Sequence, residues 1–189
     1  DLELLKADPS KFWKDVTEIG ENAFEELSDL KEITIPESIT KIGKSAFWGT
    51  GLTSISLPKG LTKIEAGLFS QCENLKTVSI PDTVTEIEEA AFYDTAITSI
   101  SIPNSIKTIK NGAFAACKDL ESITIPESVT EIEKFTFNGC SSLTSISLSN
   151  SLTKIGEKAF NGCSSLNSIN IPEKVTEIGE NAFFGCSNL

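Results

Sequence analysis

Five cysteines are the most reactive side chains of this chain, and four of them recur at a constant spacing. Cys117, Cys140, Cys163 and Cys186 lie 23 residues apart, whereas Cys72 stands alone. If residues at this spacing stack, their Cα atoms come within the roughly 4.4–6.8 Å that a disulfide spans, so distance does not exclude bridges. Side chains in such a row run parallel and do not face one another, which favours reduced, buried thiols. No C-x-x-C pair occurs, so we expect no zinc site, no other metal and no cofactor.

Serine and threonine hydroxyls form the second candidate group. They alternate with apolar residues in segments such as 75–80, which predicts that they lie on the solvent face of short strands. Such a face offers many hydrogen bonds to a broad protein partner but no Trp, Tyr or Arg anchor. The alternative interpretation is that Ser and Thr simply suit a solvated β-surface. The candidate binding residues are Thr77, Ser79, Ser99, Ser101, Ser122, Thr124, Ser145 and Ser147.

Catalysis is not expected, because the residue types that carry most of it are missing. The chain has no His and no Arg, so all 16 basic residues are Lys. Without His there is no Ser-His-Asp or Cys-His nucleophile system, and without Arg there is no bidentate clamp for phosphate or carboxylate. Carboxylates such as Glu86, Glu131 and Glu177 alternate with Lys along the chain. That pattern indicates a solvated surface and not the acid pair in a cleft that a glycosidase needs.

The charge and the chain ends narrow the range of partners. A formal net charge of −11 argues against binding to nucleic-acid phosphates or anionic membranes. No run of 18 apolar residues occurs, and residues 1–6 lack the features of a signal peptide. The chain begins without Met and stops at Leu189 inside a turn, so we interpret it as a piece of a longer protein. An unfinished turn predicts a C-terminal edge that frays or self-associates.

A repeat of 22 or 23 residues must position all of these side chains. The alternation in the segment equivalent to 75–80 predicts a strand, and the proline that follows ends it. The rest of each turn is too short for a full helix, so we expect extended segments and tight turns, with room for one 3₁₀ turn. One turn cannot offset its own ordering entropy, so turns must stack and their strands must form a parallel sheet. The marker phenylalanines of the repeat are Phe24, Phe47, Phe69, Phe92, Phe114, Phe137, Phe160 and Phe183.

The repeat also defines the domain organisation. Residues 16–189 are expected to form one array of about eight turns that ends in mid-repeat, and residues 1–15 an N-terminal capping half-turn. Two turns are one residue short and carry Thr50 and Thr95 in the cysteine position. We expect the neighbouring Trp48 and Tyr93 to fill the volume that is lost there.

The repeated pattern of residues 16–189 reads L-x-x-I-x-I-P-x-x-V-T-x-I-x-x-x-A-F-x-x-C, with departures such as Thr136 for Ala and Ser149 for Pro. It resembles the BspA-like (Treponema-type) leucine-rich repeat family of bacterial surface proteins. The resemblance implies an α/β-type, mostly β, right-handed curved solenoid with a parallel sheet on its concave face. It also implies a cell-surface or secreted location in a bacterium or protist, and adhesion to host matrix or cell-surface proteins. A structural spacer that presents other domains away from the cell is the alternative.

A second hydroxyl series lies two residues after the proline position. Its expected role is structural, because the resemblance places there a side chain that satisfies buried loop amides, which Ser and Thr can do. A catalytic role would lack a base. The series comprises Ser38, Thr83, Ser105, Ser128 and Ser151.

Overall fold

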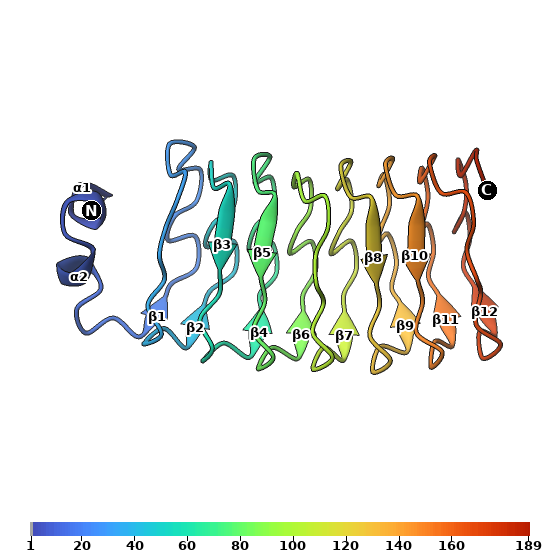
Figure 1. Ribbon diagram of the computed structural model, residues 1–189, viewed down its shortest axis with the longest axis horizontal. Helices are drawn as coiled ribbons and strands as arrows, with labels where there is room; N and C mark the ends of the chain where they lie inside the picture. The colour runs from blue at the N-terminus through green and yellow to red at the C-terminus, as the bar shows by residue number, and fades with distance from the viewer. Residues whose placement is uncertain (1) are drawn as a thin grey trace.

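Short extended segments form because apolar and polar residues alternate and a proline then ends the pairing. In the computed structural model, which describes residues 2–189, these segments lie side by side in the successive coils of a solenoid (Figure 1). In each three-residue strand the middle residue is buried or half-buried and its two neighbours are exposed. The strands are β3 (Ser54–Ser56), β5 (Thr77–Ser79), β8 (Ser122–Thr124) and β10 (Ser145–Ser147).

A second row of strands runs along the return side of the coils, where the sequence predicts extended segments. All pairing in this row is parallel, in the orders β1-β2, β4-β6-β7 and β9-β11-β12. The parallel, mostly β solenoid is thus confirmed. In residues 2–189 the links between the strands are turns, without the 3₁₀ helix for which the sequence leaves room. The strands are β1 (Glu18–Ile19), β2 (Lys41–Ile42), β4 (Lys63–Ile64), β6 (Glu86–Ile87), β7 (Thr108–Ile109), β9 (Glu131–Ile132), β11 (Lys154–Ile155) and β12 (Glu177–Ile178).

An aromatic spine runs through the whole array. We use this name for the stacked rings of the eight marker phenylalanines, from Phe24 to Phe183. Neighbouring ring centroids are 5.2–5.8 Å apart, and the rings are inclined by no more than 22°. Each phenylalanine from Phe24 to Phe160 also donates its backbone N–H to a carbonyl of the next coil, at 2.8–3.1 Å. The spine therefore joins every pair of neighbouring coils by ring stacking and by a hydrogen bond.

Pairing between the three-residue strands is less continuous than the sequence predicts. Within residues 2–189, segment 32–34 does not pair with 54–56, segment 77–79 does not pair with 99–101, and segment 145–147 does not pair with 168–170. The first two gaps come directly before a strand of a coil that is one residue short, whereas the third precedes a coil of full length. The residue is missing from the link before Leu52 and before Ile97, where other coils have two residues. The loop absorbs the missing residue without a shift of register at the first gap, because Thr53 still donates its N–H to the carbonyl of Lys31 at 3.2 Å, as Lys76 does to Thr53 at 2.9 Å.

Where one row of strands lacks pairing, the other row supplies it. The β1–β2 pair bridges the first gap, and the β4–β6 pair bridges the second. Conversely, β2 and β4 do not pair with each other, but β3–β5 joins their two coils. In the same way, β8–β10 joins the coils of β7 and β9, which do not pair with each other. One cause is visible at β2 and β4, where pairing would place Lys41 beside Lys63, and like charges side by side are destabilising. Every junction between coils thus keeps at least one strand pair in addition to the spine.

The N-terminal end is closed by two helices where the sequence predicts a half-turn of the repeat. These are α1 (Leu2–Ala7) and α2 (Pro9–Phe12), and Asp8 caps α2 by accepting the N–H of Lys11 at 3.1 Å. Proline at the first helical position and an aspartate cap favour a helix over a strand here. The rings of Phe12 and Trp13 each lie 6.4 Å from the ring of Phe24. The helices thus cover the first ring of the spine, while the domain boundary after residue 15 stays a prediction.

The C-terminal end, in contrast, exposes apolar side chains. Ile178, Phe184 and Leu189 are 52%, 67% and 51% exposed, and Phe183 is only partly buried. Figure 1 shows this last coil at the end of the array opposite the helices. Among the described residues, no helix has the length and hydrophobicity to cross a membrane.

The spine predicts a graded response to ring removal. Phe114→Ala deletes a fully buried ring with a stacking partner on each side, so we expect it to lower the free energy of unfolding by about 3–5 kcal/mol. Phe183→Ala deletes a half-buried ring with one stacking partner and should cost less than about half as much. Urea unfolding followed by circular dichroism measures both. Equal losses from the two substitutions would show that the spine is not the central support.

Candidate functional site

The eight candidate residues form what we call the hydroxyl face, and the structure exposes all of them. Strand β8 pairs with β10, which sets Ser122 beside Ser145 and Thr124 beside Ser147. A single bridge between Ser99 and Ser122 adds segment 99–101 to this group. The other two candidates, Thr77 and Ser79, lie across the gap and pair with β3. The structure therefore divides the hydroxyl face into a group of six and a group of two.

Two hollows open on this side of the solenoid, and each coincides with a gap in strand pairing. The larger, of about 1160 Å³, lies between the N-terminal helices and the first three coils and includes Thr77 and Ser79. The smaller, of about 500 Å³, begins at the second gap, and we call it the 99–104 crevice. Its polar lining consists of Asp82, Ser99, Ser101, Asn104, Ser122 and Thr124. Four of the eight candidate residues thus line one concave feature, which sequence reasoning did not anticipate.

The second hydroxyl series has the expected structural role, but its hydrogen bonds run in the opposite direction. Four of its five side chains, all except Ser151, donate to backbone carbonyls of the preceding coil and do not satisfy amides. Thr83 Oγ1 donates to the carbonyl of Leu61 at 2.6 Å, and Ser105 Oγ donates to that of Val84 at 2.6 Å. Ser38 and Ser128 make equivalent bonds. These four hydroxyls join neighbouring coils and are not free to bind a ligand.

All five cysteines are free thiols, and the two at the ends of the repeated series illustrate their environment. Cys117 is fully buried, and its Sγ donates to the carbonyl of Phe92 at 3.0 Å, while the half-buried Cys186 donates to Phe160 at 3.1 Å. Burial raises the pKa of Cys117 to about 11, against a weaker opposing effect of the Thr95 hydroxyl. Burial likewise raises the pKa of Cys163 to about 12. Thiolates are therefore scarce at neutral pH, and the cysteines support the spine instead of reacting.

The shortened coils fill the cysteine position differently from the expectation. Thr50 and Thr95 are almost fully buried, and their hydroxyls lie 3.3 Å from Sγ of Cys72 and of Cys117, respectively. Tyr93, in contrast, is 38% exposed. The prediction that the aromatic residue fills the lost volume is therefore wrong for Tyr93. Threonine has nearly the volume of cysteine and takes its place directly.

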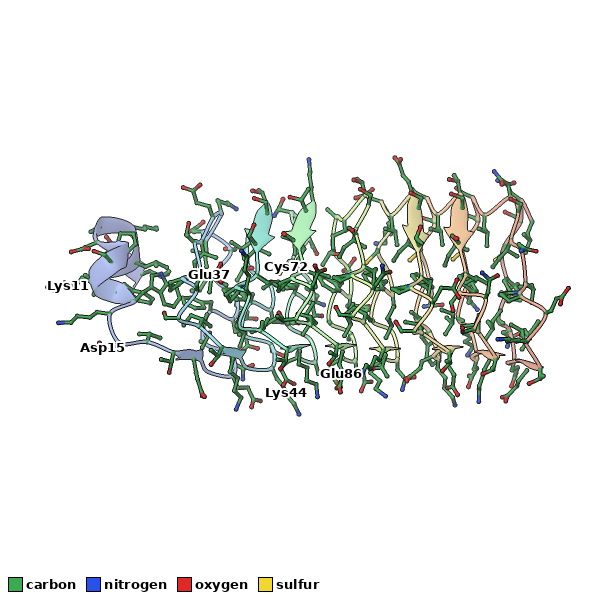
Figure 2. The ribbon with its side chains drawn as sticks, turned by 60° about the horizontal axis from the view of Figure 1, so that its bottom comes forward. Lys11, Asp15, Glu37, Lys44, Cys72 and Glu86 are labelled. Carbon is green, nitrogen blue, oxygen red and sulfur yellow. The ribbon has the colours of Figure 1, made fainter. Side chains whose placement is uncertain are left out.

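Charged side chains on the return side form pairs between neighbouring coils. Lys63 Nζ lies 3.3 Å from Glu86 and 3.0 Å from Glu88, and Lys154 Nζ lies 3.0 Å from Glu177. Figure 2 shows the side chains of Glu86 and Lys44 pointing away from the core, whereas Cys72 lies inside the coil. Among residues 2–189, no group of three or more Cys, Asp or Glu could hold a metal ion. The carboxylates thus pair with lysines across the coils, as exposed ion pairs of small individual energy do.

The stacked coils, the parallel strands and the inward apolar residues define a leucine-rich repeat solenoid, a fold typical of interaction scaffolds. The chain belongs to the BspA-type leucine-rich repeat family, whose model matches residues 8–121 and 85–189 in six copies. The predicted family is thereby confirmed.

Two solved structures show the same architecture. A leucine-rich repeat protein of T. pallidum is 27% identical over 92% of this chain and 72% of its own, with a TM-score of 0.73. A leucine-rich cell surface protein of Faecalibacterium prausnitzii is 30% identical over 92% of this chain and 69% of its own, with a TM-score of 0.53. A search of curated protein sequences found no match.

The raised pKa of Cys117 predicts a pH-dependent stability. The folded pKa of about 11 exceeds the usual 9.0, so the stabilisation is complete below pH 9 and disappears between roughly pH 9 and 11. Cys117→Ala lacks this group. Under reducing conditions, the unaltered protein should lose about 2 kcal/mol of unfolding free energy between pH 8 and pH 10.5 that Cys117→Ala does not lose. The difference in unfolding free energy between the two proteins should therefore become smaller by that amount. Urea unfolding at both pH values measures this change, and parallel pH profiles would contradict it.

Proposed function

We propose that the chain is the protein-binding module of a bacterial cell-surface or secreted protein, and that the hydroxyl face contacts the partner. Supporting this proposal is the exposure of all eight hydroxyl residues in neighbouring coils. A flat array of small neutral groups suits a broad partner surface, held by many individually weak hydrogen bonds. Enzymatic activity is not part of the proposal, because the chain lacks His, the usual base that activates a hydroxyl nucleophile.

The location and the class of partner rest on the family. The relative from Faecalibacterium prausnitzii is described as a cell surface protein, and a surface position gives access to the proteins of a host. We therefore propose adhesion to host matrix or cell-surface proteins as the role of the module. The competing role, a spacer that carries other domains, requires the length of the array but not the chemistry of this face.

A charge substitution on the larger hydroxyl group tests the binding role. Replacing Ser99, Ser101, Ser122 and Thr124 with lysine should reduce the capture of matrix or plasma proteins by the immobilised chain at least about tenfold, because each lysine blocks contact. The thermal unfolding midpoint should fall only slightly, since all four side chains are exposed and only the neighbouring positions 99 and 122 bring like charges together.

A control with the same charge change removes the effect of net charge. Thr40, Thr62, Thr130 and Thr176 are exposed threonines that flank the return strands, and lysine at these four positions should leave capture unaltered. Capture that survives the first set of substitutions would favour the spacer. Loss of capture with both sets would trace it to charge and not to the hydroxyl face.

We also propose that two copies associate weakly through the C-terminal edge, where Ile178 and Phe184 are exposed. Replacing both with aspartate should abolish any concentration-dependent dimer in sedimentation velocity, whereas Tyr93→Asp, on the side of the array, should not. A chain that is monomeric at all concentrations before substitution would refute the proposal.

A further inference from the structure

The 99–104 crevice is the place where the regular wall of the solenoid opens. On both sides of the gap the last apolar residue of the segment, Ile80 or Ile102, is half-buried, and so is the proline that follows it. The equivalent Leu57 and Ile125 belong to paired strands and are only 6% and 2% exposed. Because segment 77–79 does not pair with 99–101, these apolar side chains are more accessible to solvent than the residues that follow β3 and β8. The floor of the crevice includes Ile100, Ile102 and Pro103.

A carboxylate without a partner lies at the rim of this crevice. Most coils carry a polar residue directly after the proline position, and two of these residues bond to the next coil. Glu37 accepts the backbone N–H of Lys59 at 2.8 Å, and Glu127 accepts that of Asn150 at 3.1 Å. Asp82 occupies the same position but is one methylene shorter, and within residues 2–189 no hydrogen bond or ion pair engages its carboxylate.

The side chain of Asn104 lines the crevice together with Asp82. Asn104 follows Asp82 in the next coil as Lys59 follows Glu37 and Asn150 follows Glu127. In those two cases the glutamate accepts the backbone N–H of the residue in the next coil. The crevice thus combines a free carboxylate, an amide, four hydroxyls and an apolar floor.

Resting on the proposed protein-binding role, we propose that the 99–104 crevice receives an arginine side chain of the partner. The aliphatic stem packs on Ile102 and Pro103, as long cationic side chains do on apolar surface. The planar guanidinium carries five N–H donors and meets the Asp82 carboxylate in a charge-assisted pair. The hydroxyls of Ser99 and Ser101 and the side-chain oxygen of Asn104 accept the remaining donors.

Two observations favour this occupant. All the polar groups named here can accept hydrogen bonds and one is negatively charged, so a ligand rich in donors with a positive charge fits best. The chain has a net charge of −11, which draws a cationic partner toward its surface. The volume of about 500 Å³ lies within the usual range of about 300–1,000 Å³ for small binding pockets.

The larger hollow beside the helices fits the same ligand less well. Its lining includes Lys6 and Lys31, which repel a cation. Its lining carboxylates are Asp29, Glu32 and Glu37, of which Glu37 is already bound to the N–H of Lys59. Only the 99–104 crevice offers a free carboxylate without a neighbouring lysine in its lining.

Titration with argininamide, followed by amide NMR shifts, tests the inference without any protein partner. We expect saturable shifts of residues 99–104 in the millimolar range, and about tenfold weaker binding for Asp82→Asn. Glu173→Gln is the matched control, because Glu173 is an exposed acid at the same position of a later coil, outside the crevice. It should leave the titration unchanged. Citrullinamide, which has nearly the same shape but no charge, should bind at least about tenfold more weakly than argininamide.

The results separate this inference from the proposed function. Shifts spread evenly over all acidic positions, equal binding of citrullinamide, or full retention of binding by Asp82→Asn would each overturn the arginine site. If argininamide does not bind but the four lysine substitutions abolish protein capture, the arginine site is refuted and the binding face stands. If argininamide binds at 99–104 but no protein is captured through the hydroxyl face, the crevice stands and the proposed function fails.

Discussion

The whole array depends on the contact between one phenylalanine and the next. Strand pairing is discontinuous on both sides of the solenoid, but ring stacking and the phenylalanine N–H bond recur at every junction. Each coil alone buries too little apolar surface to offset the entropy of ordering it, so its stability comes from its neighbours. The cysteine thiols, which donate to phenylalanine carbonyls in preceding coils, strengthen the same column. Strands on either side can therefore vary without loss of the fold.

The sequence predicts this column well because a fixed spacing of large apolar residues has one simple structural solution. It predicts the strand rows for a related reason, since alternation and a terminal proline act locally. The N-terminal helices were missed although their signals were present. Asp8 and Pro9 form an ordinary helix start, but the spacing of Phe12 and Trp13 suggested an extension of the repeat.

The candidate site is predicted less completely, because its distinctive parts depend on how neighbouring coils fit together. The missing residues before Leu52 and Ile97 are visible in the sequence, but the sequence does not show which strand segments pair with the next coil and which do not. The difference between Asp82 and Glu127 is a single methylene. Its effect on bonding to the next coil appears only once the distance between coils is known.

The alternation of strand pairing between the two sides also has a mechanical consequence. Because some junctions are hydrogen-bonded on the strand side and others on the return side, the solenoid has no uniformly stiff edge. Bending at the junction between segments 77–79 and 99–101 widens the strand side without breaking any ladder bond there, while β4–β6 acts as the hinge. The strand side is therefore least restrained where segments 77–79 and 99–101, and likewise 145–147 and 168–170, are not hydrogen-bonded to each other.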